Sequence, residues 1–137
     1  MKRGSKVEGR RSKVFGLLPP LCVALSLAAP YALGANRPSA EQAKIDWLLS
    51  EIGNSHATFI RNGKEYDAAK AVSHIKTKLL FAGRRVQTVQ QFILGVASHS
   101  EETKKPYEIR LPDGKQETME TWLLERLAVY EKGHRGR

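Results

Sequence analysis

Apolar residues recur every three or four positions in four stretches of this chain. The first stretch runs from Ile45 to Ile52, and similar patterns follow over residues 68–79, 89–97 and 119–130. This spacing places the apolar side chains on one face of a helix, while the polar residues between them face water. The pattern therefore predicts four amphipathic helices whose apolar faces meet in one core.

Residues with strong end preferences indicate where these helices begin and end. Asp67 can cap the second helix, because its carboxylate can accept a hydrogen bond from a free N–H group of the first turn. The first helix is expected to end at Gly53-Asn54 and the second at Gly83, since glycine adopts the left-handed conformation that commonly follows a helix. Two capping boxes, each a hydroxyl residue followed three positions later by glutamine, are expected at Ser39 with Gln42 and at Thr88 with Gln91.

Two further stretches have the pattern of strands. "TFIRNGKEY" (58–66) predicts a hairpin, because both residues of Asn62-Gly63 tolerate the positive φ of a two-residue type I′ turn. Apolar and polar residues alternate over 107–111, which is typical of a half-buried strand, and we expect it to pair with an arm of the hairpin. Together the patterns predict a single α+β domain that is predominantly helical, with about four helices and a small antiparallel sheet or hairpin.

The N-terminal part of the chain has a different pattern. A basic start is followed by an apolar run over 14–29 and by small residues just before Ala35, which together are typical of a secretory signal peptide. An uncleaved anchor is the alternative, but this run is shorter than the about 20 residues that span a bilayer, and two prolines interrupt it. We predict a signal peptide over 1–34, cleaved before Ala35. Arg10-Arg11 hints at twin-arginine export, although the residues that follow match that signal poorly.

Removal of this leader changes the charge balance. It holds six of the 23 basic residues and one of the 14 acidic ones, so the remainder has 17 and 13 and a net charge of +4. Nucleic-acid binding thereby loses its main support, and no stable membrane insertion is expected. The only cysteine, Cys22, is also removed, so packing alone must stabilise a periplasmic domain over 35–131. The basic tail, 132–137, is expected to be flexible.

Arg61 is the first residue of the hairpin with possible chemistry. It faces Lys64 across the predicted turn, and like charges in that position repel. A solvated turn with two splayed cations is the simplest interpretation. The alternative is that the planar, bidentate guanidinium of Arg61 binds a carboxylate, such as that of Glu65 or Asp67, or the anionic group of a ligand.

His74 is expected at the edge of the apolar face of the second helix, next to Ile75. A half-buried, hydrogen-bonded histidine would explain this position without any function. The alternative is that His74 forms the wall of a small anion pocket together with Lys78 and Arg61.

Ser98, His99 and Ser100 raise the possibility of a hydrolase. The chain has no G-x-S-x-G motif, and no acid stands at a recognisable spacing from His99. The simpler interpretation is a helix end and a polar loop whose hydroxyl groups bond to the backbone. The histidines lack paired spacing, so no metal site is predicted, and no phosphate loop or dinucleotide motif indicates a cofactor.

Two long stretches resemble a known family. "FIRNGKEY…AAKAVSHIKTKL", followed by "TVQQFILGVASHSEETKKPYEI", is similar to the YfeK-like family of small exported bacterial proteins, a domain of unknown function. The resemblance implies export to the periplasm of a Gram-negative bacterium and implies no activity. Its relatives tend to have glycine where Lys104 stands, which puts a glycine-dependent turn in doubt. The residues that carry the resemblance are Arg61, Asn62, Gly63, His74, Lys78, Leu79, Ser98, Ser100, Pro106 and Tyr107.

We therefore predict a small periplasmic protein with a non-catalytic role in binding or interaction. Its partner is expected to be an anionic ligand or another envelope protein, and an interaction surface would appear as an exposed apolar patch. The hypothetical binding residues are Arg61, Asn62, His74, Lys78, Ser98, Ser100 and Tyr107.

Two alternatives remain open at this stage. One is a small hydrolase that pairs His74 or His99 with Ser98 or Ser100, which requires them in a partly enclosed site. The other is a basic module that binds anionic envelope polymers. The cations that would have to gather on one side are Lys70, Lys76, Arg84, Arg85 and Lys104.

Overall fold

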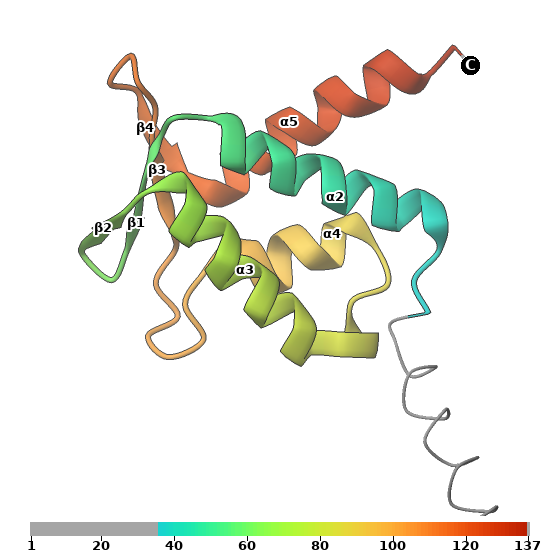
Figure 1. Ribbon diagram of the computed structural model, residues 1–137, viewed down its shortest axis with the longest axis horizontal. Coiled ribbons are helices and arrows are strands. Elements are labelled where there is room, and N and C mark those ends of the chain that lie inside the picture. The colour runs from blue at the N-terminus through green and yellow to red at the C-terminus, as the bar shows by residue number, and fades with distance from the viewer. Residues whose placement is uncertain (1–35, 137) are drawn as a thin grey trace, which may run out of the picture. The chain divides into compact units, whose positions relative to one another are not determined.

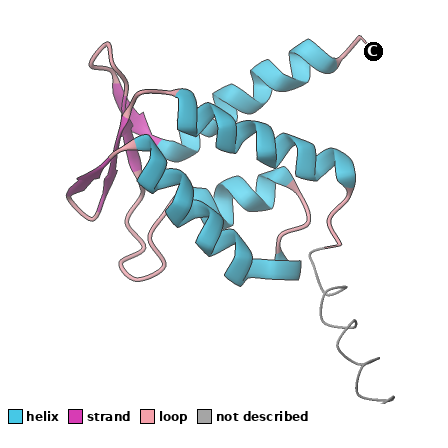
Figure 2. Ribbon diagram, in the orientation of Figure 1, coloured by secondary structure: helices cyan, strands magenta, loops and turns pink. Residues whose placement is uncertain are grey.

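The computed structural model describes residues 36–136, so the expected signal peptide lies outside the described residues. Within this range the helices pack beside one another, and the strands gather at one end of them (Figures 1 and 2). The predicted α+β fold with its small antiparallel sheet is confirmed. The elements are α2 (Ser39–Asn54), β1 (Thr58–Arg61), β2 (Lys64–Tyr66), α3 (Ala68–Ala82), η3 (Gly83–Arg85), α4 (Val89–Phe92), η4 (Ile93–Ala97), β3 (Glu108–Arg110), β4 (Gln116–Thr118) and α5 (Met119–His134).

The sheet has the order β2-β1-β3-β4, and every neighbouring pair is antiparallel. Asn62 and Gly63 have φ values of 52° and 79°, so the type I′ turn between β1 and β2 forms as predicted. The strand at β3 pairs with β1, also as predicted, and places Ile109 opposite Phe59. Strand β4 was not expected, because its three residues are all polar and it forms only through its pairing with β3.

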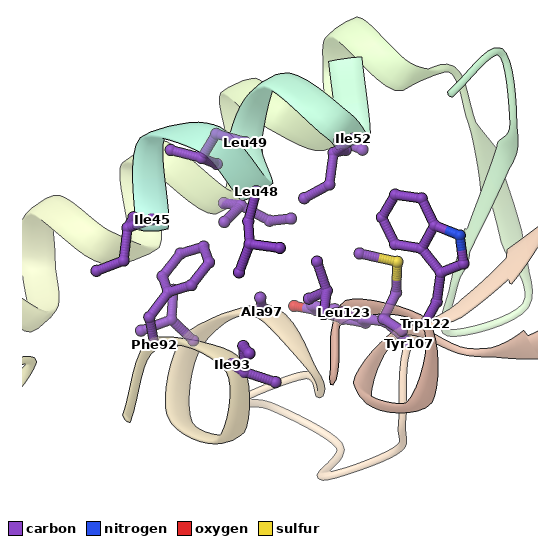
Figure 3. Close-up of a cluster of buried hydrophobic side chains, with 14 of the residues drawn as sticks. Ile45, Leu48, Leu49, Ile52, Phe92, Ile93, Ala97, Tyr107, Trp122 and Leu123 are labelled. Carbon is purple, nitrogen blue, oxygen red and sulfur yellow. The ribbon is translucent and has the colours of Figure 1, made fainter. Parts of the chain in front are cut away.

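The core lies between the helices and one face of the sheet. Figure 3 shows Leu48 of α2 among side chains from the elements that face it, including Phe92 of α4 and Leu123 of α5. These three side chains are completely buried, as is Ile109 of the sheet. Burial of a large apolar side chain contributes about 1.5–3 kcal/mol relative to its exposure, so the four faces together stabilise the domain without a disulfide.

The expected capping box of α2 is wrong, and its predicted end is confirmed in position but not in mechanism. Pro38 occupies the N-cap position and no side chain bonds there, because the side chain of Gln42 contacts Arg37 and Asp46 instead of the helix start. The helix ends at Asn54, as expected, but Gly53 does not adopt the left-handed conformation that we expected there.

The C-terminal end of α2 is formed by the residues that follow this glycine. Ser55 is the C-cap, and its hydroxyl donates to the carbonyl of Ile52 at 2.8 Å. The left-handed residue is His56, with a φ of 54°. A polar side-chain bond therefore replaces the glycine turn that the sequence suggested.

The predicted helix ends at Asp67, at Gly83 and at Thr88 with Gln91 are confirmed. The carboxylate of Asp67 accepts from the N–H group of Lys70 at 2.8 Å, and Gly83 follows α3 with a φ of 53°. The capping box of Thr88 with Gln91 begins α4. Helix α5 continues to His134, three residues into the expected tail.

The third predicted helix changes its hydrogen-bond pattern along its length. Its first turn is α-helical, and Ile93–Ala97 are π-helical. Segments of this kind are short and often occur near functional sites. Here the π-helical segment leads directly into the polar loop that carries Ser98 and Ser100. None of the helices in residues 36–136 is long and apolar enough to cross a membrane.

Candidate functional site

A cavity of about 270 Å³ is bounded by the β1–β2 hairpin, α3 and the start of α5. Phe59, Ile75 and Met119, all buried in the core, supply much of its apolar lining. No carboxylate lines it. The polar groups in its wall belong to Arg61, Tyr66, Lys70, His74 and Tyr107.

The guanidinium group of Arg61 lies against the imidazole ring of His74. Its Nη1 atom is 3.1 Å from Nδ1 and 2.9 Å from Nε2 of this ring. Because the two ring nitrogens flank one carbon, an atom close to both must lie over the face of the ring rather than in its plane. Arg61 therefore stacks on His74, and its carbon Cζ also lies 5.6 Å from the centre of the Tyr66 ring.

No carboxylate of the described residues pairs with Arg61. Glu65, which we considered as a partner, binds Arg110 instead at 2.8 Å. Asp67 caps α3. Stacking on aromatic rings does not neutralise the cation, so Arg61 brings an uncompensated positive charge to the cavity.

His74 is neutral at pH 7. Its pKa lies below the usual 6.5, first because partial burial disfavours the charged ring and then because Arg61 and Lys78 are close. Its Nε2 atom lies 3.1 Å from the hydroxyl oxygen of Tyr107. A neutral imidazole has one donor and one acceptor nitrogen, so this bond can form in either direction.

Tyr107 and Lys78 extend this network toward the loop over 98–107. The ammonium group of Lys78 donates to the carbonyl of His99 at 2.7 Å and to the hydroxyl of Tyr107 at 3.4 Å. Burial lowers the pKa of Lys78 and raises that of Tyr107, in each case because it disfavours the charged form. Glu101, 3.9 Å from the ammonium group, partly offsets the effect on Lys78.

Asn62 and Ser100 connect the hairpin turn to the same loop. The amide of Asn62 donates to the hydroxyl of Ser100 at 3.3 Å, and its carbonyl oxygen accepts from Thr103. Ser100 is buried and does not line the cavity, so its contacts stabilise the loop. The backbone of Ser100 accepts from the N–H group of Lys104 at 2.8 Å.

Lys104 stands where the family resemblance led us to expect glycine. Its φ is 62°, in the left-handed region that favours glycine. The turn at this position therefore forms with lysine in place of glycine, and the backbone of Lys104 is strained.

Ser98 and His99 do not form an activated nucleophile. The Ser98 hydroxyl is 3.1 Å from Nδ1 of His99, but it donates its single hydrogen to the carbonyl of Leu94 at 2.9 Å. The imidazole must then donate to the serine rather than accept its proton. Ser98 is also only 4% exposed, so this arrangement gives no support to the hydrolase alternative.

The structure thus brings the seven predicted residues into one polar network, but only three of them line the cavity. Arg61, His74 and Tyr107 are in its wall. Asn62 with Ser100 joins the loop to the hairpin, Lys78 joins it to α3, and Ser98 bonds back to Leu94 of η4.

Two polar residues of the cavity, Tyr66 and Lys70, were not among the predicted binding residues. Tyr66 could have been found, because a two-residue hairpin places it opposite Phe59. Lys70 had no such signal, since only the packing of α3 on the hairpin brings it to the cavity. No group of histidine, cysteine and acidic residues within 36–136 could hold a metal ion.

The chain resembles proteins whose roles are not known. It is 36% identical over 88 residues to a protein of Salmonella typhimurium described as "Uncharacterized protein YfeK", a match that covers 64% of this chain and 73% of that protein. No solved structure matches the chain significantly. Residues 39–131 match the family of unknown function DUF5329. Because this match spans most of the chain and includes the whole network, the chain belongs to the DUF5329 family.

Proposed function

We propose that this protein is an exported, non-catalytic binding protein of the bacterial periplasm. Its ligand is a small organic anion with an apolar body, such as a short aliphatic or aromatic carboxylate. The leader-like pattern over 1–34 supports the export, and the cavity beside α3 supports the binding.

The charge of the cavity carries the proposal. Arg61 has no acidic partner among the described residues, and Lys70 adds a second cation to a wall that holds no carboxylate. His74 is neutral and can supply a hydrogen bond without adding charge. The guanidinium group can bind the two oxygens of a carboxylate in the bidentate manner that lysine cannot provide.

The size and lining of the cavity restrict the rest of the ligand. Its volume of about 270 Å³ is at the lower end of small-molecule sites, which excludes large cofactors. The apolar lining from Phe59, Ile75 and Met119 favours a hydrocarbon chain or ring over a sugar. Nucleic acid does not fit a site of this size.

Thermal-shift and calorimetric titrations with benzoate and hexanoate test the binding, with benzamide and hexanamide as neutral counterparts. We expect the carboxylates to stabilise the protein and their amides to do so much less. Arg61→Gln should weaken carboxylate binding by about tenfold to a hundredfold, because a hydrogen-bonded charge pair contributes about 1.5–3 kcal/mol. Arg61→Lys should restore only part of the affinity.

Arg110→Gln is the matched control. Arg110 lies on neighbouring β3 but has its own carboxylate partner and does not line the cavity. Loss of the Arg110 guanidinium group should leave carboxylate binding unchanged. The binding proposal fails if neither carboxylate binds or if Arg61→Gln binds as well as the wild type. Mass spectrometry of the exported protein tests the location, and an N-terminus at Met1 would contradict it.

A further inference from the structure

The C-terminal end of α3 exposes two large apolar side chains in succession. Leu80 and Phe81 are 79% and 78% exposed. Leu94 is 50% exposed, and it lines a surface groove together with Phe81. Single exposed apolar residues are common, but a contiguous group of them on a small domain indicates a contact surface.

The stretch of chain that carries these side chains is basic, although Glu101 lines the groove beside Phe81 and Asp46 lines another groove with Lys76. Between Asp67 and Glu101 there is no aspartate or glutamate, while five lysines and arginines occur. Lys76 and Arg84 are exposed and stand four positions before and after Leu80 in the chain.

The other cations of this segment have different roles. Lys78 points inward to the carbonyl of His99, and Arg85 donates to the carbonyls of Phe81 and Ala82 at 3.3 Å. Arg85 therefore holds the end of α3 in place and remains exposed beside the apolar pair.

We propose that this surface, formed by Lys76, Leu80, Phe81, Arg84 and Arg85, docks reversibly on a bilayer that contains anionic phospholipids. The leucine and phenylalanine enter the boundary between headgroups and acyl chains, and the cations contact the headgroup phosphates. The contact is peripheral, since none of the helices described here could span a bilayer. It is separate from the carboxylate cavity, which α3 lines near its other end.

The charge of the surface and its apolar side chains favour a bilayer over a second copy of the chain or a soluble anionic polymer. A second copy of the chain in a symmetric dimer would place the same cations opposite each other, which is unfavourable. A soluble anionic polymer would satisfy the cations but leave Leu80 and Phe81 in water. Glu101, the acid at the groove, is already close to Lys78 and Lys104 and so does not cancel the exposed charges.

Vesicle co-sedimentation tests this proposal. The protein is purified after expression of the full chain with its own leader, and it is mixed with vesicles of phosphatidylcholine alone or with added phosphatidylglycerol. We expect binding only when phosphatidylglycerol is present, and weaker binding at high salt. Leu80→Ser with Phe81→Ser should reduce partitioning at least tenfold. Lys76→Gln with Arg84→Gln should reduce partitioning to the vesicles by about fivefold for each cation removed.

Helix α5 offers a matched control. Leu124 and Val129 are 42% and 49% exposed, and Glu125 lies between them. Leu124→Ser with Val129→Ser should leave vesicle binding unchanged. Circular dichroism of each variant shows whether it is folded.

Three outcomes overturn the proposal. The first is the absence of wild-type binding to the phosphatidylglycerol vesicles, and the second is an equal loss in the α5 control. The third concerns heparin, a polyanion without lipid. The proposal is overturned if the protein binds heparin as strongly as it binds the vesicles and if Leu80→Ser with Phe81→Ser does not weaken the binding to heparin. That result would assign the cations to polymers, as in the alternative drawn from the sequence.

Discussion

The hydroxyl group of Tyr107 offers a direct measure of how much the polar network stabilises the fold. Tyr107→Phe removes this group but keeps the ring, which is 6% exposed and part of the core. The hydroxyl oxygen lies 3.1 Å from Nε2 of His74 and 3.4 Å from Nζ of Lys78. The first contact is the stronger, because the second is near the limit for a hydrogen bond.

The expected cost follows from these two contacts. Lys78 keeps its 2.7 Å hydrogen bond to the carbonyl of His99, so the loss of its contact with the Tyr107 hydroxyl costs little stability. His74 loses its in-plane partner, since Arg61 stacks on its face. A net hydrogen bond contributes about 1 kcal/mol, and an unsatisfied buried group adds to the loss, so we expect about 1–2 kcal/mol.

Thermal and urea unfolding measure this difference. For a domain of this size 1 kcal/mol corresponds to about 4–8 °C in Tm, so Tyr107→Phe should lower Tm by about 4–16 °C. Tyr66→Phe is the control, because no hydrogen bond of the Tyr66 hydroxyl occurs within the described residues and its ring still faces Arg61. If both variants change Tm equally, the Tyr107 hydroxyl does not hold the network together and our account of it is wrong.

Two further predictions concern the loop and the histidine of the network. Lys104→Gly should stabilise the protein by about 1 kcal/mol in urea unfolding, because glycine adopts the φ of 62° without strain. Lys104→Ala loses the same charge but keeps the strain, so an equal gain there would refute this reason. The pKa of His74 is lower in the folded protein than in the unfolded chain, so the unfolded chain takes up the proton first as the pH falls. The stability that depends on neutral His74 is therefore complete above pH 6.5 and decreases as the pH falls below 6.5. NMR titration should show this ring titrating below 6.5, and His74→Gln should flatten the dependence of the urea midpoint on pH in that window.

Much of the fold could be predicted because its signals are local. The turn at Asn62-Gly63 requires positive φ at two successive residues, and few other residue pairs accept this. The cap at Asp67 depends on one side chain and the helix start beside it. The position at which α2 ends could also be predicted, but its mechanism could not, because the hydroxyl of Ser55 and the left-handed His56 replace the glycine turn there.

The sequence alone determined the helical faces, the hairpin and the separation of the N-terminal leader pattern from the rest of the chain. These features follow from the spacing of apolar residues and from backbone preferences, which act over a few neighbouring positions. Only the tertiary structure decided that Arg61 stacks on His74 beside an apolar cavity, and that Ser98 is buried with its hydroxyl bonded to the backbone. Such features depend on contacts between segments distant in the chain, and a linear pattern does not show which distant segments lie against each other.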